Sequence, residues 1–160
     1  MMKRETIFLK LVIVLMALPA IAISIFVVPP MTGFVGEILP KWEFLKYVFM
    51  LTLYGSAIAY FAALYQTLKL LGYIDKGIAF SERSVKALKN IKYCALAITV
   101  LFILNLPIIL YTAEVDDAPG LGGLGMIITF GAIVIAVFAA VLQKLLQNAI
   151  DIKSENDLTV

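Results

Sequence analysis

Residues 47–68 read Tyr-Val-Phe-Met-Leu-Thr-Leu-Tyr-Gly-Ser-Ala-Ile-Ala-Tyr-Phe-Ala-Ala-Leu-Tyr-Gln-Thr-Leu, a run of 22 residues without a charge. A helix rises about 1.5 Å per residue, so this run covers the roughly 30 Å hydrocarbon core of a bilayer. Soluble helices carry a polar stripe on their outer face, and residues 51–64 have none. The stretch is therefore typical of a membrane-spanning helix and not of a soluble four-helix bundle.

Three further uncharged runs cover residues 11–28, 93–113 and 118–143. Hydrophobic residues make up 62% of the chain and charged residues only 15%, far from the balance of a soluble domain. Backbone groups find no water inside a bilayer, so these runs must cross it as helices. We predict an all-α, polytopic membrane protein with one membrane domain (1–160), a four-helix bundle whose spans lie at about 7–28, 45–70, 91–112 and 124–147.

Proline and glycine mark the expected connections between the spans. Pro119 and the glycines that follow it at 120, 122 and 123 predict a loop before the fourth span. The segment 29–43 is expected to lie on the membrane surface or to cap the bundle. Trp42, Phe44 and Tyr47 at its end predict an interfacial aromatic anchor for the second span.

Positive charge is sorted to one side of the predicted bundle. Of the 13 lysine and arginine residues, all but Lys41 and Lys46 lie near the N-terminus, between the second and third spans, or after the fourth. The positive-inside rule then places both termini, the loop at 71–90 and the tail at 148–160 in the cytoplasm. We therefore expect a multi-pass protein of the cell (plasma) membrane with its N-terminus and C-terminus cytoplasmic.

The first span has a competing interpretation. Lys3 and Arg4, an apolar stretch and then Ala20-Ile21-Ala22 resemble a secretory signal with a small-residue cleavage site. The apolar run continues as far as Val28, however, which favours a span that is retained. Cleavage would leave three spans without changing the side on which any later segment lies.

The residue types needed for catalysis or metal binding are scarce. The chain has no histidine and a single cysteine, Cys94, so we predict no metal site, no cofactor and no enzyme activity. No Asp, Glu, Lys, Arg or His sits in the middle of a span, which argues against a proton-coupled pump. Asn105 precedes Pro107 by two residues and predicts a kink whose freed carbonyl is capped by a neighbouring helix; the alternative is a polar notch in the membrane.

Small residues recur at four-residue spacing in two of the spans. Small side chains let helix backbones approach one another closely inside a membrane. We expect contacts within the bundle, with a homo-oligomer as the alternative use of the same faces. The residues are Gly55, Ala59 and Ala63 in the second span and Ala132, Ala136 and Ala140 in the fourth.

A helix start is well marked before the third span. Ser81 suits the N-cap, and Glu82 suits the positive end of the helix dipole. The predicted cytoplasmic amphipathic helix leads into the third span and presents Arg83, Lys86, Lys89 and Lys92. Composition favours a basic collar that binds anionic lipid headgroups. The sharper interpretation is a docking face for a cytoplasmic partner.

The fourth span continues as an amphipathic extension through Ile152, which could lie along the bundle or pair with the helix after Ser81. A disordered end is the default for a terminus. The last residues, 157–160, are also suited to add as a strand to the sheet edge of a partner. The candidate partner- or lipid-contact residues are Arg83, Lys86, Lys89, Lys92, Glu155, Asn156, Asp157 and Leu158.

Three segments together resemble a known family: residues 77–81, Leu88-Lys89 with Ile91, and the terminal Glu-Asn-Asp-Leu-Thr-Val at 155–160. The chain resembles a bacterial family of four-span membrane proteins of unknown function, over essentially its whole length. Members of that family are often encoded beside a small Cro/CI-type helix-turn-helix regulator. The resemblance therefore implies a membrane-side partner or antagonist of such a regulator, and it carries over no catalytic residues.

Our leading hypothesis is capture, in which a regulator held at the membrane cannot occupy its operator. A component of a transport system or of a peptide or drug immunity system is the alternative. A structural bundle with a lipid-binding collar is also consistent with the sequence. We expect no direct nucleic-acid binding, because topology explains the basic residues and no recognition-helix unit is visible.

Overall fold

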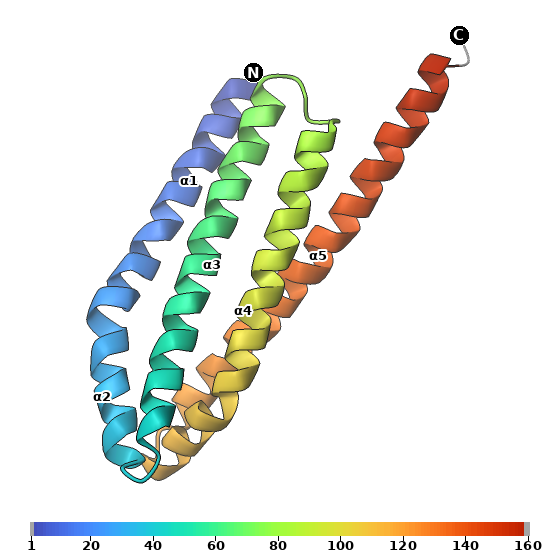
Figure 1. Cartoon of the computed structure of the whole chain (residues 1–160). Coiled ribbons are helices and arrows are strands. Elements are labelled where there is room, and N and C mark those ends of the chain that lie inside the picture. Colours follow the sequence, from blue (N-terminus) through green and yellow to red (C-terminus); the bar gives the residue numbers. More distant parts are fainter. Residues whose placement is uncertain (1, 159–160) are drawn as a thin grey trace.

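The chain forms four long helical rods (Figure 1). The computed structural model describes residues 2–158, with side chains from residue 4 onward. The regular elements of this part of the chain are all helical, as predicted. They are α1 (Met2–Ala22), a π-helical segment (Ile23–Val27), α2 (Val28–Ile38), α3 (Glu43–Asp75), α4 (Glu82–Val115) and α5 (Pro119–Leu158).

The four rods run alternately up and down, so both termini lie at the same end of the molecule (Figure 1). We call this the terminal end; it also holds the connection at 76–81. The connections at 39–42 and 116–118 lie at the opposite end, which we call the loop end. The two ends therefore carry different segments, as the order of spans predicts.

The first rod is α1 continued through the π-helical segment into α2. Pro29 and Pro30 have no N–H to donate to the carbonyls four residues earlier. The N–H of Val28 instead reaches back five residues to the carbonyl of Ile23. The prolines thus widen the helix locally without ending it. The helix continues through residues 29–38, a segment that the sequence predicted to cap the bundle or to lie on the membrane surface.

Two of the connections are closed by a residue with positive φ. Gly77 has φ 74° after α3, and the N–H of Ile78 donates to the carbonyl of Tyr73 at 2.9 Å. Asp117 has φ 52° after α4, and the N–H of Ala118 donates to the carbonyl of Ala113 at 2.8 Å. Both are Schellman-type ends, which satisfy carbonyls that the helix leaves free. They make the turns short and fix how neighbouring helices meet.

The expected loop at 119–123 is wrong, because α5 begins at Pro119. Proline suits the first helical position, where its missing N–H costs nothing. The helices α4 and α5 pack closely at two of the glycines near the start of α5, Gly122 and Gly125. A Cβ on Gly122 would lie 3.0 Å from Leu110, and one on Gly125 would lie 3.2 Å from Ile109.

The predicted helical extension through Ile152 is confirmed, but the expected disordered or extended end is wrong for residues 155–158, since α5 continues to Leu158. The sequence holds neither glycine nor proline after Gly131. The Gln147 side chain also donates to the Asp151 carboxylate one turn later, at 3.1 Å, a spacing that supports a helix. Thr159 and Val160, the end of the proposed strand segment, lie outside the described residues.

The helices pack in sequence order, with α4 between α3 and α5 and with α1 against α3. A buried cluster of Val35, Phe49, Ile108 and Ile109 fills the loop end. Ala132 and Ala136 of α5 are buried, and Gly55 of α3 faces Leu101 of α4. The small-residue stripes therefore make contacts within the bundle, as predicted.

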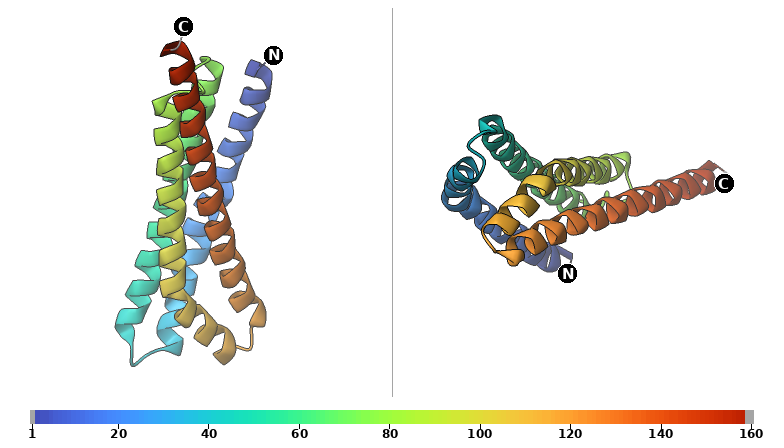
Figure 2. Two further views of the ribbon diagram at one scale, coloured as in Figure 1. Left: turned by 90° about the vertical axis from the view of Figure 1, so that its right-hand side faces the viewer. Right: turned by 90° about the horizontal axis from the view of Figure 1, so that it is seen from below.

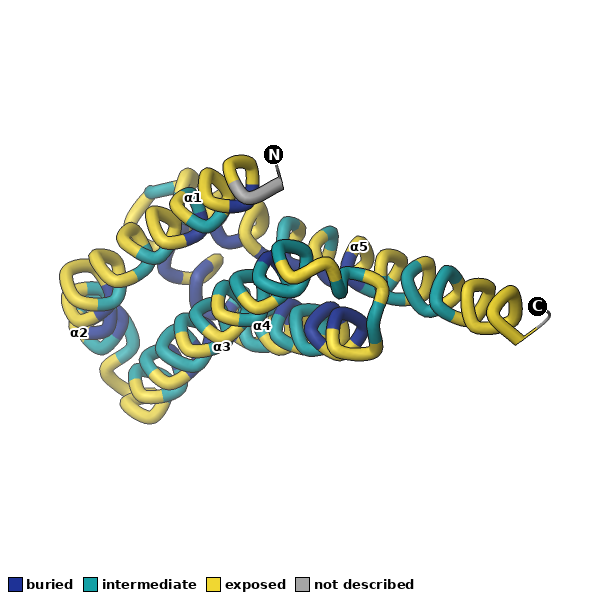
Figure 3. The backbone as a smooth tube through the Cα atoms, turned by 90° about the horizontal axis from the view of Figure 1, so that it is seen from above, coloured by how far each residue is buried: buried dark blue, intermediate teal, exposed yellow. Residues whose placement is uncertain are grey.

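The outer surface of the rods is apolar, which a membrane protein requires. Each rod contains a span that is long and apolar enough to cross a bilayer, and in the most apolar window of the first rod only 6% is buried. In Figure 3 the buried residues lie where helices face one another, and the outward sides are exposed. An apolar outer surface of this kind is stable against lipid and unstable against water, so the chain is an integral membrane protein.

Candidate functional site

The candidate site is built at the terminal end, where the connection 76–81 fixes the start of α4. The Ser81 hydroxyl donates to the carbonyl of Ile78 at 2.7 Å and accepts the N–H of Ser84 at 3.4 Å. Ser84 is fully buried, and its hydroxyl also donates to the Ile78 carbonyl. The predicted N-cap at Ser81 is confirmed. This cap fixes the first turn of α4, and the basic side chains project from the helix that begins there.

Three of the four predicted basic residues, Arg83, Lys86 and Lys89, are exposed on α4, and Lys92 is half-buried. The ammonium groups of Lys89 and Lys92 lie 5.9 and 4.8 Å from the ring centroid of Tyr93. Within the described part of the chain, none of these four side chains forms an ion pair. The face therefore keeps its full positive charge.

The predicted tail residues Glu155, Asn156, Asp157 and Leu158 occupy the last turns of α5, where all of them are exposed. The Gln147 side chain donates to the Glu82 carboxylate at 3.2 Å, so Gln147 is level with the start of α4. The tail begins eight residues later, about 12 Å farther along the helix. In Figure 2 the end of α5 runs out past the other helices. The structure thus does not bring the basic face and the tail together.

An apolar groove lies between these two predicted regions and was not found from the sequence. It measures about 360 Å³ and is lined by Ile74, Ala79, Phe80, Leu88, Leu142 and Leu146, among others. Phe80 is 63% exposed at its edge. The groove is formed jointly by residues of α3, the connection 76–81, α4 and α5, so the periodicity of one helix does not reveal it.

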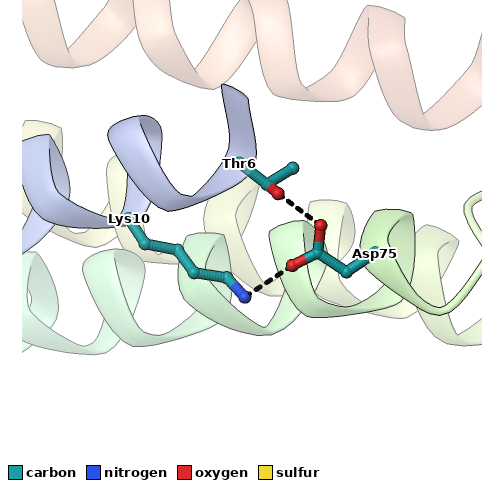
Figure 4. Close-up of polar contacts among 3 residues, drawn as sticks. All are labelled: Thr6, Lys10 and Asp75. Atoms are coloured by element: carbon teal, nitrogen blue, oxygen red, sulfur yellow. Dashed lines mark hydrogen bonds and ion pairs between the residues drawn. The ribbon is translucent and has the colours of Figure 1, made fainter. Parts of the chain in front are cut away.

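A second feature missed from the sequence ties the first rod to the terminal end (Figure 4). The Lys10 ammonium lies 2.7 Å from one oxygen of the Asp75 carboxylate, and the Thr6 hydroxyl donates to the other. Lys10 and Thr6 lie on α1, while Asp75 is the last residue of α3. Asp75 is the lone acidic residue between Glu43 and Glu82, and this isolation was the available signal.

The largest cavity that we describe lies at the loop end, with a volume of about 590 Å³. Its walls are mostly apolar, with Trp42, Leu45, Pro107 and Tyr111 among them, and Lys41 is the charged residue at its edge. It lies beside the proline of α4. The cavity offers few polar groups that could select a ligand.

The match to known sequences agrees with this four-helix geometry. Residues 6–160 match the profile of DUF2975, a family described as proteins of unknown function. The chain belongs to the DUF2975 family. The resemblance to a four-span family of unknown function is thereby confirmed.

A curated relative of this DUF2975 protein comes from Bacillus subtilis (strain 168). It is described as the uncharacterized membrane protein YoaS, and it is 52% identical over 160 residues that cover 100% of both chains. No solved structure matches the chain. The relative's description supports the membrane location and adds no activity.

Among the described residues of this DUF2975 protein, two buried polar side chains have polar atoms without a hydrogen-bond partner. Asn105 is fully buried, and neither the nitrogen nor the oxygen of its amide is paired; the Thr112 hydroxyl is unpaired as well. By contrast, Thr52, Ser56, Thr99 and Thr129 each donate to the carbonyl four residues earlier on the same helix. Asn105 thus does not cap the carbonyl that Pro107 leaves free.

Proposed function

We propose that this protein is a membrane anchor that captures a small soluble transcription regulator at its terminal end. The observation that carries the proposal is the helical extension of α5 past the bundle. All of residues 151–158 are exposed, although a helix that only crosses the membrane needs no such extension. The partner class is the one implied by the resemblance given above, a small helix-turn-helix protein.

The distribution of charge supports a cytoplasmic terminal end. Of the 13 basic residues, only Lys41 and Lys46 belong to the loop end. Glu114 in the last turn of α4 and Asp116 and Asp117 in the connection at 116–118 make this part of the loop end acidic. The positive-inside rule assigns such an asymmetry to a cytoplasmic terminal end, where a soluble regulator would be found.

The acidic groups of the extension support a specific mode of capture. Asp151 and Glu155 are one helical turn apart, so they share a face of α5, and Asp157 follows. A DNA-binding protein holds DNA largely through basic contacts to phosphates. The carboxylates of the extension would occupy the same basic surface. Capture and operator binding then exclude each other, and the regulator is released when the extension is displaced.

The apolar groove gives the captured protein a second point of attachment. It opens beside the root of the extension, since Leu142, Leu146 and Ala149 of α5 form one wall. Apolar contacts supply most of the affinity at interfaces, while charges set encounter and orientation. The proposal therefore assigns binding to the groove and selection to the extension. It assigns no catalytic chemistry to the chain.

An affinity purification in mild detergent tests this proposal. The protein is tagged at the N-terminus in its own host, and co-purified proteins are identified by mass spectrometry. Three versions are compared: the intact chain, a truncation lacking residues 154–160, and Glu155→Gln with Asp157→Gln. Glu37→Gln with Glu43→Gln at the loop end is the matched control.

A small DNA-binding protein should be recovered with the intact chain and the loop-end control, and lost from the other two versions. Recovery of the same partners from every version, including one with Arg83, Lys86 and Lys89 reversed to Glu, would show that this surface is not used. Loss of resistance to a peptide or drug on deletion, without any captured regulator, would instead favour the transport or immunity role.

A further inference from the structure

Four exposed tyrosines show where the membrane begins and ends along two helices. Tyr47 and Tyr65 are 18 residues apart on α3, as are Tyr93 and Tyr111 on α4, and all four are about half exposed. At 1.5 Å per residue each pair spans about 27 Å, close to the thickness of a hydrocarbon core. Tyrosine favours the membrane–water interface. The edge of the membrane at the terminal end therefore passes near Tyr65 and Tyr93.

A polar groove lies between α4 and α5 at this edge. It has a volume of about 340 Å³ and is lined by Lys92, Ala140, Gln143, Lys144, Gln147 and Asn148. Lys92 adjoins Tyr93, which places the groove at the boundary. The small side chain of Ala140 provides the depth, and the long polar side chains form the walls. The groove is thus distinct from the apolar groove beside Phe80.

The chemistry of the lining favours an anion. Two ammonium groups and three amides line the groove, and no carboxylate does within the described residues. The nearest acidic groups that the contacts identify, Glu82 and Asp151, both accept the Gln147 amide. The Gln147 N–H groups are therefore already paired, and the groups of the lining left for an anion are Lys92, Lys144, Gln143 and Asn148. Lys92 and Lys144 form no ion pair with the side chains that the structure describes.

We infer that this groove binds the phosphate of an anionic phospholipid headgroup. Its position at the membrane edge favours a lipid over a soluble phosphate. Deeper in the membrane, Leu96 of α4 and Val137 of α5 are exposed, so acyl chains can run along apolar side chains directly from the groove. Basic pockets between membrane helices bind lipid headgroups in this way. The site does not depend on capture of a regulator.

Native mass spectrometry of the full-length protein from nanodiscs tests the inference. The discs contain equal amounts of phosphatidylglycerol and phosphatidylcholine, and the retained lipids are counted. Two lysines near an anionic surface predict a preference for phosphatidylglycerol of roughly 30-fold. Lys92→Gln with Lys144→Gln should reduce it to near parity, and Lys144→Gln alone should reduce it about fivefold. The double variant Lys86→Gln with Lys89→Gln removes the same amount of charge outside the groove. Its preference for phosphatidylglycerol should stay within about twofold of that of the unaltered protein.

Three outcomes would overturn the assignment. Equal loss of the preference in both double variants would show a diffuse basic collar. An unchanged preference for phosphatidylglycerol in Lys144→Gln would exclude the groove as the binding site. Because Lys144 is exposed, this substitution leaves the fold intact. Displacement of phosphatidylglycerol by millimolar inorganic phosphate would show a site for a soluble anion. Circular dichroism melting of each variant confirms that the helices remain folded.

Discussion

The ammonium of Lys10 lies 2.7 Å from the carboxylate of Asp75 and joins α1 to the end of α3 across 65 positions of sequence. The Lys10 side chain is 36% exposed and that of Asp75 17%, so the pair is partly shielded from water. Since α1 packs mainly on α3, this contact is the polar anchor of the first rod at the terminal end.

Breaking this pair should loosen α1. We expect Asp75→Ala to lower the free energy of unfolding in detergent by about 1–3 kcal/mol, because Lys10 and Thr6 both lose a charged hydrogen-bond acceptor. A double-mutant cycle with Lys10→Ala should give a coupling energy of about 1 kcal/mol. Lys41→Ala, at the loop end, is the control. A coupling energy of zero would mean that the ion pair contributes nothing to stability.

Removing the unpaired amide of Asn105 should stabilise the bundle. Asn105→Leu replaces a fully buried group that has no hydrogen-bond partner, and such groups cost about 1–3 kcal/mol. Thermal melting of the purified protein measures the gain. Thr112→Val should shift the melting temperature in the same direction. If Asn105→Leu melts below the parent, the amide has a partner in solution and the interior differs from the one described.

The close approach of α4 and α5 depends on a glycine. A Cβ at Gly125 would lie 3.2 Å from Ile109, whereas one at Gly131 would meet nothing within 4 Å. Gly125→Val should therefore lower the stability by about 1–3 kcal/mol through overpacking. Gly131→Val, the matched control on the same helix, should change it much less. Equal losses of stability in the two variants would show that the close contact between α4 and α5 does not lie at Gly125.

Much of this architecture could be predicted from the sequence because it depends on local patterns. Uncharged runs defined four membrane helices, and Ser81 followed by Glu82 marked the start of α4. Local rules failed where tertiary contacts changed the outcome. The segment after Pro119 is helical, with Gly122 packed on Leu110 and Gly125 on Ile109, and the Pro29–Pro30 pair lies in a helix that widens and continues.

The candidate site was only partly predictable for a similar reason. The basic residues of α4 and the tail of α5 were found from composition, but their separation follows from the helical tail, which begins about 12 Å beyond the level of the start of α4. The apolar groove requires three helices to meet, and the Lys10–Asp75 pair joins distant positions. Single-sequence patterns report the faces of one helix, so neither feature left a periodic signal.

The orientation of the bundle can be tested by cysteine labelling in intact cells. In a Cys94→Ala background, Lys41→Cys at the loop end should react with a membrane-impermeant maleimide. Ser154→Cys, near the end of α5, should react only after the cells are permeabilised. Both positions are exposed, so accessibility decides the result. The reverse pattern would place the terminal end outside the cytoplasm and end the capture proposal.

Photocrosslinking from position 158 tests the central claim most directly. Leu158 is 83% exposed at the end of the described helix, and a photoreactive amino acid there samples whatever the extension touches in growing cells. We predict one crosslinked adduct to a small DNA-binding protein, absent when the probe is placed at Trp42 of the loop end. An adduct pattern that is the same from both positions, or no protein adduct from position 158, would contradict capture by the extension.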